Sequence, residues 1–138
     1  MDWRFGLMIY GIGLDMVEVA RIEESLQRFG ERFQKRIFTE VERAYCNGLP
    51  HPPLHFAARF AAKEAFLKAL GTGLSNAISW KDVGIENLPS GKPELRVIGR
   101  ALELANERAI THMHVSLTHT NSHAAAVVVL DNAGVVDR

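Results

Sequence analysis

A carboxylate and a lysine stand at helical spacing in the segment from Arg59 to Gly73, which reads RFAAKEAFLKALGTG. Glu64 and Lys68 are four positions apart, so they lie on one face of a helix. Gly71 and Gly73 can end that helix and leave backbone N–H groups free for an anion. This combination suits a metal–phosphate site, but an amphipathic helix with an ordinary ion pair and a glycine C-cap would show the same pattern.

A second carboxylate follows an apolar segment near the start of the chain. Residues 9–14 read IYGIGL and indicate a short strand, and Asp15 comes directly after it. Carboxylates at such strand ends are suitable ligands for Mg²⁺, which prefers oxygen. Asp15 and Glu18 also have the spacing of a helix N-cap and its N3 partner, so a capping role remains an alternative.

Three motifs cover residues 8–130, nearly the whole chain. They are Gly11–Asp15 with Arg21-Ile22, Phe60–Ala65 with Lys68–Gly73, and His114–Thr120 followed by the apolar run Ala124–Leu130. In type, order and spacing they resemble the motifs of the holo-acyl-carrier-protein synthases, the small 4′-phosphopantetheinyl transferases.

The resemblance implies a chemistry for the acidic and basic residues. Such enzymes move the 4′-phosphopantetheine arm of coenzyme A to a serine of apo acyl carrier protein, with Mg²⁺, and release adenosine 3′,5′-bisphosphate. They serve fatty acid biosynthesis and lipid metabolism. We expect Asp15, Glu64 and Lys68 to be catalytic, with Asp15 and Glu64 holding the metal. A carboxylate on a cation is a weak base, which favours a water as proton acceptor, but Glu64 itself remains an alternative.

The resemblance also implies a set of contacts with coenzyme A. The strand expected at 112–118 alternates apolar and polar side chains, so its polar face would offer hydrogen-bond donors in a row. A solvated helix face and a solvent-facing strand are the alternatives. Arg59 could also reach a neighbouring subunit, and His119 could simply begin a turn. The expected contacts are Arg59, Lys63, Lys68, Gly71, Gly73, His114 and Ser116.

A basic face points to the protein partner. Arg21, Arg28 and Arg32 would share one helical face, although Gly30 is expected to interrupt the helix before Arg32. The resemblance implies an acidic acyl carrier protein as partner, which such a face would steer. The alternative is a surface helix balanced by its own glutamates. Phe29 or Phe33 could be an apolar anchor for the partner, but either could equally pack in the core.

Composition indicates a small globular protein. The 138 residues carry 16 basic and 16 acidic side chains, so the formal net charge is zero, which argues against general nucleic-acid binding. No apolar run is long enough to span a membrane. The single cysteine, Cys46, cannot form an internal disulfide, which suits a reducing cytoplasm. A homotrimer with sites between subunits is implied by the resemblance.

The pattern of elements predicts an α+β fold with an antiparallel sheet packed against helices, in one domain over residues 8–130. Residues 1–7 are expected to form a flexible extension and residues 131–138 a tail. Strands are expected at 8–14, 80–86, 93–97, 112–118 and 124–130; helices at 16–29, 39–46, 54–70 and 99–108; and a turn or short helix at 33–37. Thr39 and Glu42 have the spacing of a capping box that would start the helix at 39–46.

Two other classes of function stay open at this point. One is a module that binds coenzyme A without turnover, against which the two acids argue. The other is a Mg²⁺-dependent phosphohydrolase of a nucleotide-like substrate, which would share the metal and phosphate chemistry but would not need a basic docking face.

Overall fold

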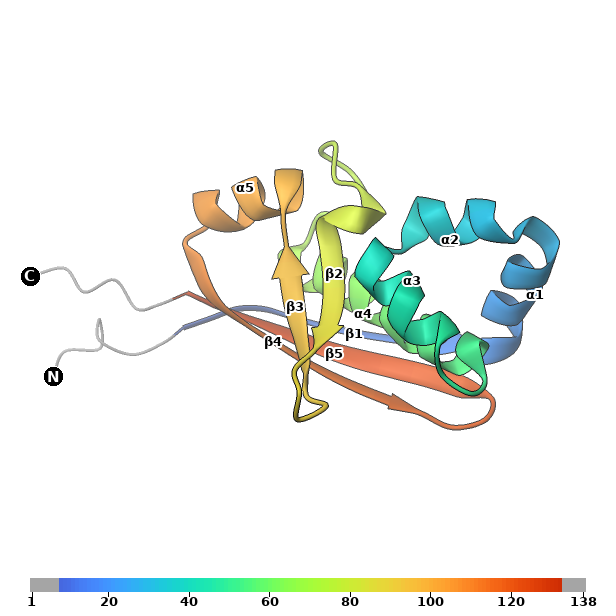
Figure 1. Ribbon diagram of the computed structural model, residues 1–138. Helices are drawn as coiled ribbons and strands as arrows, with labels where there is room; N and C mark the ends of the chain where they lie inside the picture. The colour runs from blue at the N-terminus through green and yellow to red at the C-terminus, as the bar shows by residue number, and fades with distance from the viewer. Residues whose placement is uncertain (1–7, 133–138) are drawn as a thin grey trace, which may run out of the picture.

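The computed structural model describes residues 8–132 of the protein as an α+β fold, as the sequence predicts. All helices lie on one side of a long three-stranded sheet (Figure 1). Residues 1–7, and residues 133–138 of the predicted tail, lie outside the described residues. The elements are β1 (Met8–Glu18), α1 (Val19–Phe29), α2 (Glu31–Ile37), α3 (Glu40–Asn47), α4 (Pro52–Leu70), the 3₁₀ helix η2 (Trp80–Asp82), β2 (Val83–Asn87), β3 (Pro93–Val97), α5 (Gly99–Glu107), β4 (Ile110–His119) and β5 (His123–Asn132).

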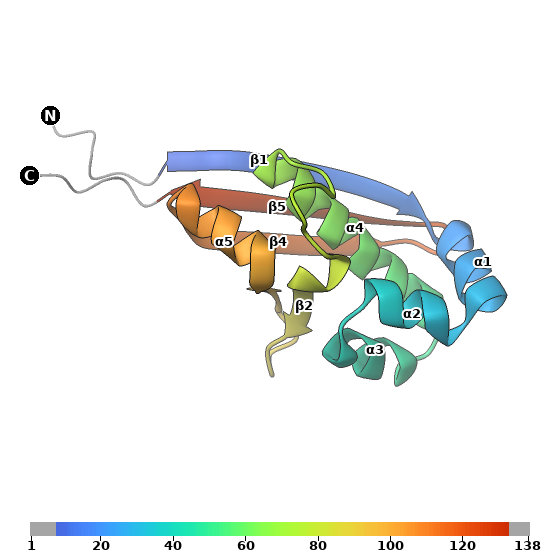
Figure 2. The ribbon, with the colours of Figure 1, turned by 90° about the horizontal axis from the view of Figure 1, so that it is seen from above.

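The main sheet is antiparallel, with β5 between β1 and β4. Helix α4 lies over this sheet (Figure 2). Every second residue of β5 is buried beneath the helices, namely Ala124, Ala126, Val128 and Leu130. On β1 the opposite face of the strand leaves Ile12, Leu14 and Met16 exposed. One face of the sheet therefore forms the core, and the other is open and partly apolar.

Two glycines let α4 approach β1 very closely. A Cβ atom at Gly11 would lie 2.0 Å from the carbonyl oxygen of Ala69, and one at Gly13 would lie 1.7 Å from that of Ala65. Any side chain at either position would collide with the helix backbone. The alanines of α4 and the glycines of β1 thus bring two of the sequence motifs into direct contact.

A smaller hairpin, β2 with β3, lies beside α4 and is joined to it through η2. Val83 and Ile85 of β2 are buried in the same apolar core as Phe66 and Leu70 of α4. Within residues 8–132, strand β2 pairs only with β3, so its second edge faces the helices rather than another strand.

The first strand and helix differ from the boundaries predicted from the sequence. Strand β1 continues to Glu18, and α1 begins at Val19 with no side-chain hydrogen bond from the N-cap residue Glu18. Asp15 therefore lies within a strand, paired with Ala126, and the capping alternative for it is wrong. The strand persists because its pairing with β5 continues as far as Glu18, opposite His123.

Other boundaries agree closely. The predicted capping box between Thr39 and Glu42 is confirmed, and Gly30, with φ 56°, separates α1 from α2. The predicted strand at 80–86 begins later, because Ser79 and Asp82 form a capping box around η2. Strand β5 runs to Asn132, so two residues expected in the tail belong to the sheet. Among residues 8–132, no helix combines the length and apolar character that crossing a membrane requires.

Candidate functional site

The exposed stripe of α4 consists of Phe60, Glu64 and Lys68. Among residues 56–70 these three alone are not buried. They repeat every four positions, so they form one line along the helix with a rise of roughly 6 Å per step. A long helix that is otherwise sunk in the core thus presents an aromatic ring, a carboxylate and an ammonium group to the outside.

Asp15 completes a cluster with the polar end of this stripe. The Nζ atom of Lys68 lies 2.9 Å from Oδ1 of Asp15 and donates to the carbonyl oxygen of Leu14 at 3.0 Å. Partial burial raises the pKa of Glu64, the nearby negative charge of Asp15 raises it further, and Lys68 opposes both. The structure therefore brings together the three residues expected to be catalytic.

The donor chemistry of this cluster fits a magnesium ion. Asp15 and Glu64 offer hard oxygen ligands, and their mutual repulsion would be relieved by a cation between them. Among residues 8–132 there is no group of three or more histidine, cysteine, aspartate or glutamate side chains placed to hold a metal. Two carboxylates, with the other positions left to water and substrate phosphates, are the usual arrangement for Mg²⁺.

The glycine-rich exit of α4 follows directly on this cluster. Gly71 and Gly73 have φ angles of 85° and 59°, and a Cβ at either would meet no atom within 4 Å. The N–H groups of Gly71 and Thr72 both donate to the carbonyl oxygen of Leu67. The C-cap role of Gly71 is thus confirmed, and the expectation that its N–H is free for an anion is wrong, because the cap uses it.

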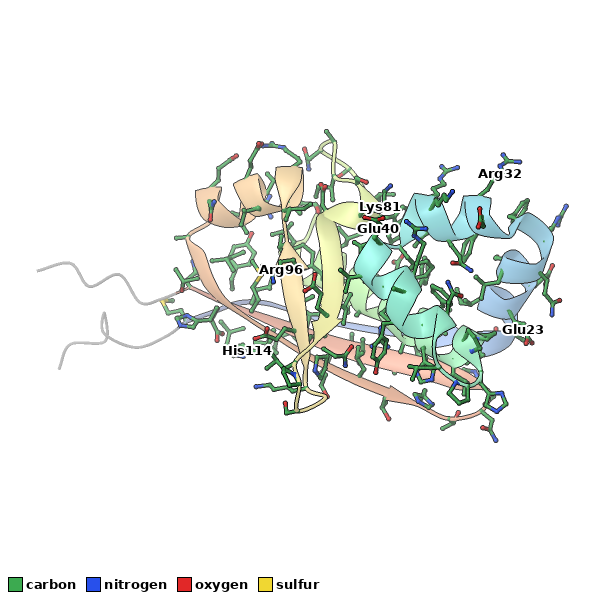
Figure 3. The ribbon with its side chains drawn as sticks, viewed as in Figure 1. Glu23, Arg32, Glu40, Lys81, Arg96 and His114 are labelled. Carbon is green, nitrogen blue, oxygen red and sulfur yellow. The ribbon has the colours of Figure 1, made fainter. Side chains whose placement is uncertain are left out.

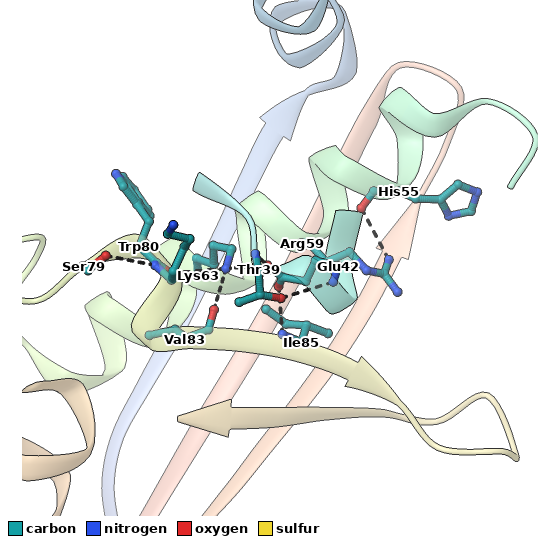
Figure 4. Close-up of polar contacts among 10 residues, drawn as sticks. Thr39, Glu42, His55, Arg59, Lys63, Ser79, Trp80, Val83 and Ile85 are labelled. Atoms are coloured by element: carbon teal, nitrogen blue, oxygen red, sulfur yellow. Dashed lines mark hydrogen bonds and ion pairs between the residues drawn. The ribbon is translucent and has the colours of Figure 1, made fainter. Parts of the chain in front are cut away.

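Lys63 does not lie where a coenzyme A contact requires it. Its side chain is 0% exposed, and Nζ lies 2.8 Å from Oε1 of Glu42. The same ammonium group donates to the carbonyl oxygens of Val83 at 2.6 Å and Trp80 at 3.2 Å (Figure 4). The structure contradicts both the expected contact and the solvated-face alternative, because α4 turns Lys63 towards the hairpin side of the core.

Arg59 lines a cavity of about 440 Å³ beside β4, here called the arginine pocket. It is only 3% exposed, so the solvated-face alternative is wrong for Arg59 too. Its Nη2 donates to Oδ1 of Asn87 at 2.7 Å, and its guanidinium carbon lies 4.5 Å from the ring centre of Tyr45. The other residues lining the cavity are Tyr45, His55, Ala58, Asn87, Gly91, Lys92, Pro93, Val115, Ser116, Leu117 and His119.

The residues expected to contact coenzyme A therefore do not form one site within a single copy of the chain. Ser116 shares the arginine pocket with Arg59, whereas His114 lies further along β4 with Nε2 3.0 Å from Oδ2 of Asp131 (Figure 3). Asp15 is on β1 and Ser116 on β4, the two outer strands, with β5 between them. One copy of the chain does not bring the acidic cluster and the arginine pocket together.

Sequence reasoning missed several residues of the arginine pocket. Tyr45, Asn87 and Lys92 lie outside the three motifs, and nothing in their spacing marks them. His55 precedes Arg59 by one helical turn, a signal that could have found it. Burial lowers the pKa of His55, and the positive charges of Arg59 and His119 lower it further. The pocket thus gathers cationic and titratable groups around a buried guanidinium.

The expected docking arginines lie near a second, apolar cavity of about 480 Å³, here called the aromatic groove. Gly30 places Arg32 on a separate helix, α2 (Figure 3), and there Arg32 lines the groove. Arg28 lies 5.3 Å from the ring centre of Phe29, and Arg21 forms an exposed pair with Glu18. The groove is lined by Phe29, Arg32, Phe33, Arg36, Ile37, Phe60 and Trp80; the places of Phe60 and Trp80 in this groove are not predicted by the sequence.

Comparison with known proteins places this site in a family. Residues 11–128 match the model of the 4′-phosphopantetheinyl transferase superfamily. The chain is 45% identical over 124 residues to the holo-[acyl-carrier-protein] synthase of Syntrophus aciditrophicus, covering 90% of this chain and 97% of that one.

Solved structures agree with the sequence match. The holo-[acyl-carrier-protein] synthase of Neisseria meningitidis superposes with a TM-score of 0.81 at 40% identity, covering 89% of this chain and 98% of that one. The corresponding Bacillus anthracis protein, in complex with CoA (3′,5′-ADP), superposes with a TM-score of 0.75 at 38% identity, covering 91% and 98%. The chain therefore belongs to the 4′-phosphopantetheinyl transferase superfamily, and within it to the holo-[acyl-carrier-protein] synthases.

Proposed function

We propose that this protein transfers the 4′-phosphopantetheine arm of coenzyme A to a serine hydroxyl of apo acyl carrier protein, in a Mg²⁺-dependent reaction that releases adenosine 3′,5′-bisphosphate. The observation that carries the proposal is the exposed stripe of α4. It joins the aromatic groove, through Phe60, to the acidic cluster of Glu64, Lys68 and Asp15. A protein docked in the groove would present its serine about one helical turn from the carboxylates.

The chemistry requires charge neutralisation more than covalent catalysis. The serine oxygen forms a bond to the phosphorus that bears the pantetheine arm, and the bond from that phosphorus to the bridging oxygen breaks. Mg²⁺ held by Asp15 and Glu64 would neutralise the pyrophosphate charge. Lys68 then supplies a positive charge for the departing phosphate, and Glu64 or a water oriented by the two carboxylates takes the serine proton.

Glu64 is better suited to proton transfer than an ordinary exposed carboxylate. The pKa of Glu64 is raised, mainly by desolvation and further by Asp15, so its carboxylate is a stronger base. A cation on the same carboxylate would oppose this effect. An oriented water therefore remains the favoured acceptor.

A homotrimer would unite the separated parts of the site. The arginine pocket and the acidic cluster lie on opposite outer strands of the sheet, so a second copy can supply the half that each copy lacks. The open sheet face gives such an assembly an apolar surface, since Ile12, Leu14 and Met16 are each more than half exposed. Arg59, Ser116 and Lys92 would then bind the nucleotide phosphates of coenzyme A beside a neighbour's carboxylates.

The acidic acyl carrier protein would dock on the aromatic groove. Phe29 and Phe33 offer apolar contact, and the exposed arginines Arg21, Arg28 and Arg32 attract a negatively charged partner. A phosphohydrolase would not need a docking surface for an acidic protein next to its metal ligands. A non-catalytic module would not need the exposed pair of Lys68 with Asp15 beside Glu64. A reducing, cytoplasmic setting suits the buried unpaired thiol of Cys46.

The test is the intact mass of an apo acyl carrier protein after incubation with the protein, coenzyme A and Mg²⁺. The proposal predicts a gain of one phosphopantetheine, abolished by chelation and restored by Mg²⁺. Release of phosphate from coenzyme A without modification of the carrier would favour the phosphohydrolase. Binding of coenzyme A without either reaction would favour the non-catalytic module.

A further inference from the structure

We infer that the buried ion pair between Glu42 and Lys63 is a positioning device that sets the walls of both substrate sites, the arginine pocket and the aromatic groove. The inference rests on the proposed function for the names of the two substrates. It adds two residues that touch neither substrate. Its basis is the set of backbone groups that the pair holds.

The pair satisfies the unpaired edge of β2. Lys63 donates to the carbonyl oxygen of Val83 at 2.6 Å, and Oε2 of Glu42 accepts from the N–H of Ile85 at 2.8 Å. Both groups lie on the edge of β2 that no strand covers. A buried strand edge needs partners for its polar groups. Two side chains therefore do for β2 what a neighbouring strand would do.

The same two side chains fix the elements on either side of that edge. Glu42 closes the capping box of α3 by accepting from the N–H of Thr39 at 2.8 Å. Lys63 also donates to the carbonyl oxygen of Trp80 in η2 at 3.2 Å. One ion pair thus joins α3, α4, η2 and β2 (Figure 4).

Each end of this connection leads to a binding wall. Trp80 lines the aromatic groove, and the centre of its ring lies 5.2 Å from the centre of the Phe60 ring. At the other end of β2, Asn87 accepts from Arg59 and donates to the carbonyl oxygen of Gly91 in the hairpin turn. That turn also contributes Lys92 to the arginine pocket.

Burial makes the pair stiff rather than adaptable. Both side chains are 0% exposed, and the three donors of Lys63 meet three acceptors in Glu42, Val83 and Trp80. A fully satisfied buried network fixes one arrangement of the groups it holds. Lys63 and Glu64 are adjacent in α4, but Glu64 points to the exposed stripe and takes no part in the network.

The experiment compares a neutral double variant, Glu42→Gln with Lys63→Met, with wild type and with Leu130→Ala. The single variant Lys63→Met would leave a buried carboxylate without its cation and could fail to fold. The double variant removes the charge together with the bonds to Trp80 and Val83. Leu130→Ala is the matched control, because Leu130 is buried in β5 and lines neither cavity.

For the double variant we expect KM for coenzyme A and KM for the carrier protein each to rise by at least about 10-fold, with kcat within about 3-fold of wild type. Leu130→Ala should lower the melting temperature and leave both KM values unchanged. A purely structural pair would instead give KM values that follow melting temperature in both variants. Unchanged KM values in the double variant would overturn the inference.

A second readout does not depend on turnover. Amide hydrogen exchange at Val83–Asn87 should accelerate in the double variant and stay slow in Leu130→Ala, and calorimetry should show weaker binding of coenzyme A only in the former. If the wild-type protein binds coenzyme A but transfers nothing, the proposed function is wrong. The inference would then still be tested by hydrogen exchange and by coenzyme A binding. Equal amide exchange rates at Val83–Asn87 in all three proteins would show that the ion pair does not hold β2, and the inference would be wrong.

Discussion

Two lysines of the same helix, five positions apart, form ion pairs of nearly equal length in opposite surroundings. Lys63 lies 2.8 Å from Glu42 with both side chains 0% exposed, whereas Lys68 lies 2.9 Å from Asp15 with its own side chain 53% exposed. The buried lysine has every donor occupied by the protein. The exposed lysine and its acidic neighbours can exchange partners with a substrate.

The comparison shows that distance alone does not assign a role to an ion pair. Desolvation, the largest influence on Lys63, lowers its pKa, and Glu42 opposes that change. Such a pair is costly to break because the remaining charge stays buried. An exposed pair contributes little to stability, so breaking it to contact a substrate costs little free energy. The fold thus buries Lys63 within the architecture and leaves Lys68 accessible for the proposed reaction.

The largest expected effect comes from replacing each lysine with methionine. Lys63→Met should lower the free energy of unfolding by about 3–5 kcal/mol, the usual cost of stranding a buried charge. Lys68→Met should change it by less than about 1 kcal/mol, yet reduce kcat/KM for transfer by about 100-fold or more through loss of a phosphate-neutralising charge. Urea denaturation and intact-mass rates measure the two quantities.

This contrast would break down if Lys68→Met proved as destabilising as Lys63→Met. It would also break down if Lys68→Met kept wild-type turnover. Lys35→Met is a suitable control, because Lys35 forms an exposed pair with Glu31 on α2, away from the acidic cluster.

A smaller effect is expected from the docking face. Reversing Arg21 and Arg28 to glutamate should raise KM for the carrier protein by about 10-fold at low salt, and the difference should shrink as salt screens the charges. KM for coenzyme A should not change, because these side chains lie outside the arginine pocket. Carrier-dependent turnover that survived the reversal at low salt would show that the docking face lies elsewhere.

The smallest expected effect is a pH dependence of coenzyme A binding. The pKa of His55 is lowered by burial, Arg59 and His119, so its imidazole is neutral in the free protein near pH 7. A bound phosphate would favour the protonated form, so the pKa rises on binding. Affinity should therefore increase a few-fold from pH 8 to pH 6, as binding takes up a proton. Calorimetry of His55→Gln should show a shallower slope, and an equal slope would exclude His55.

Some features could be predicted from the sequence because they depend on local spacing. The capping box at Thr39, the break at Gly30 and the strand Pro93–Val97 all follow from residues within a few positions of one another. Glu64 and Lys68 were recognised in the same way. Asp15 joined them through the family motifs, and the glycines of β1 show physically why the strand can reach the helix.

Other features depend on contacts that no local pattern records. The sequence treats Glu42 only as a capping residue, whereas in the fold it also holds Lys63 and the edge of β2. Similarly, Asp15 and Ser116 look like parts of one site until the sheet order places β5 between their strands. Long-range burial and strand order decided both cases.

In the proposed function, Asp15 and Glu64 form a magnesium–phosphate site at the end of the exposed stripe. Its most direct test is the rate of phosphopantetheine transfer as a function of Mg²⁺ concentration for wild type, Glu64→Gln and the surface control Glu107→Gln. We predict that Glu64→Gln raises the half-saturating Mg²⁺ concentration by at least about 10-fold with an unchanged melting temperature, while the control matches wild type. An unchanged Mg²⁺ midpoint in Glu64→Gln would show that Glu64 does not hold the metal.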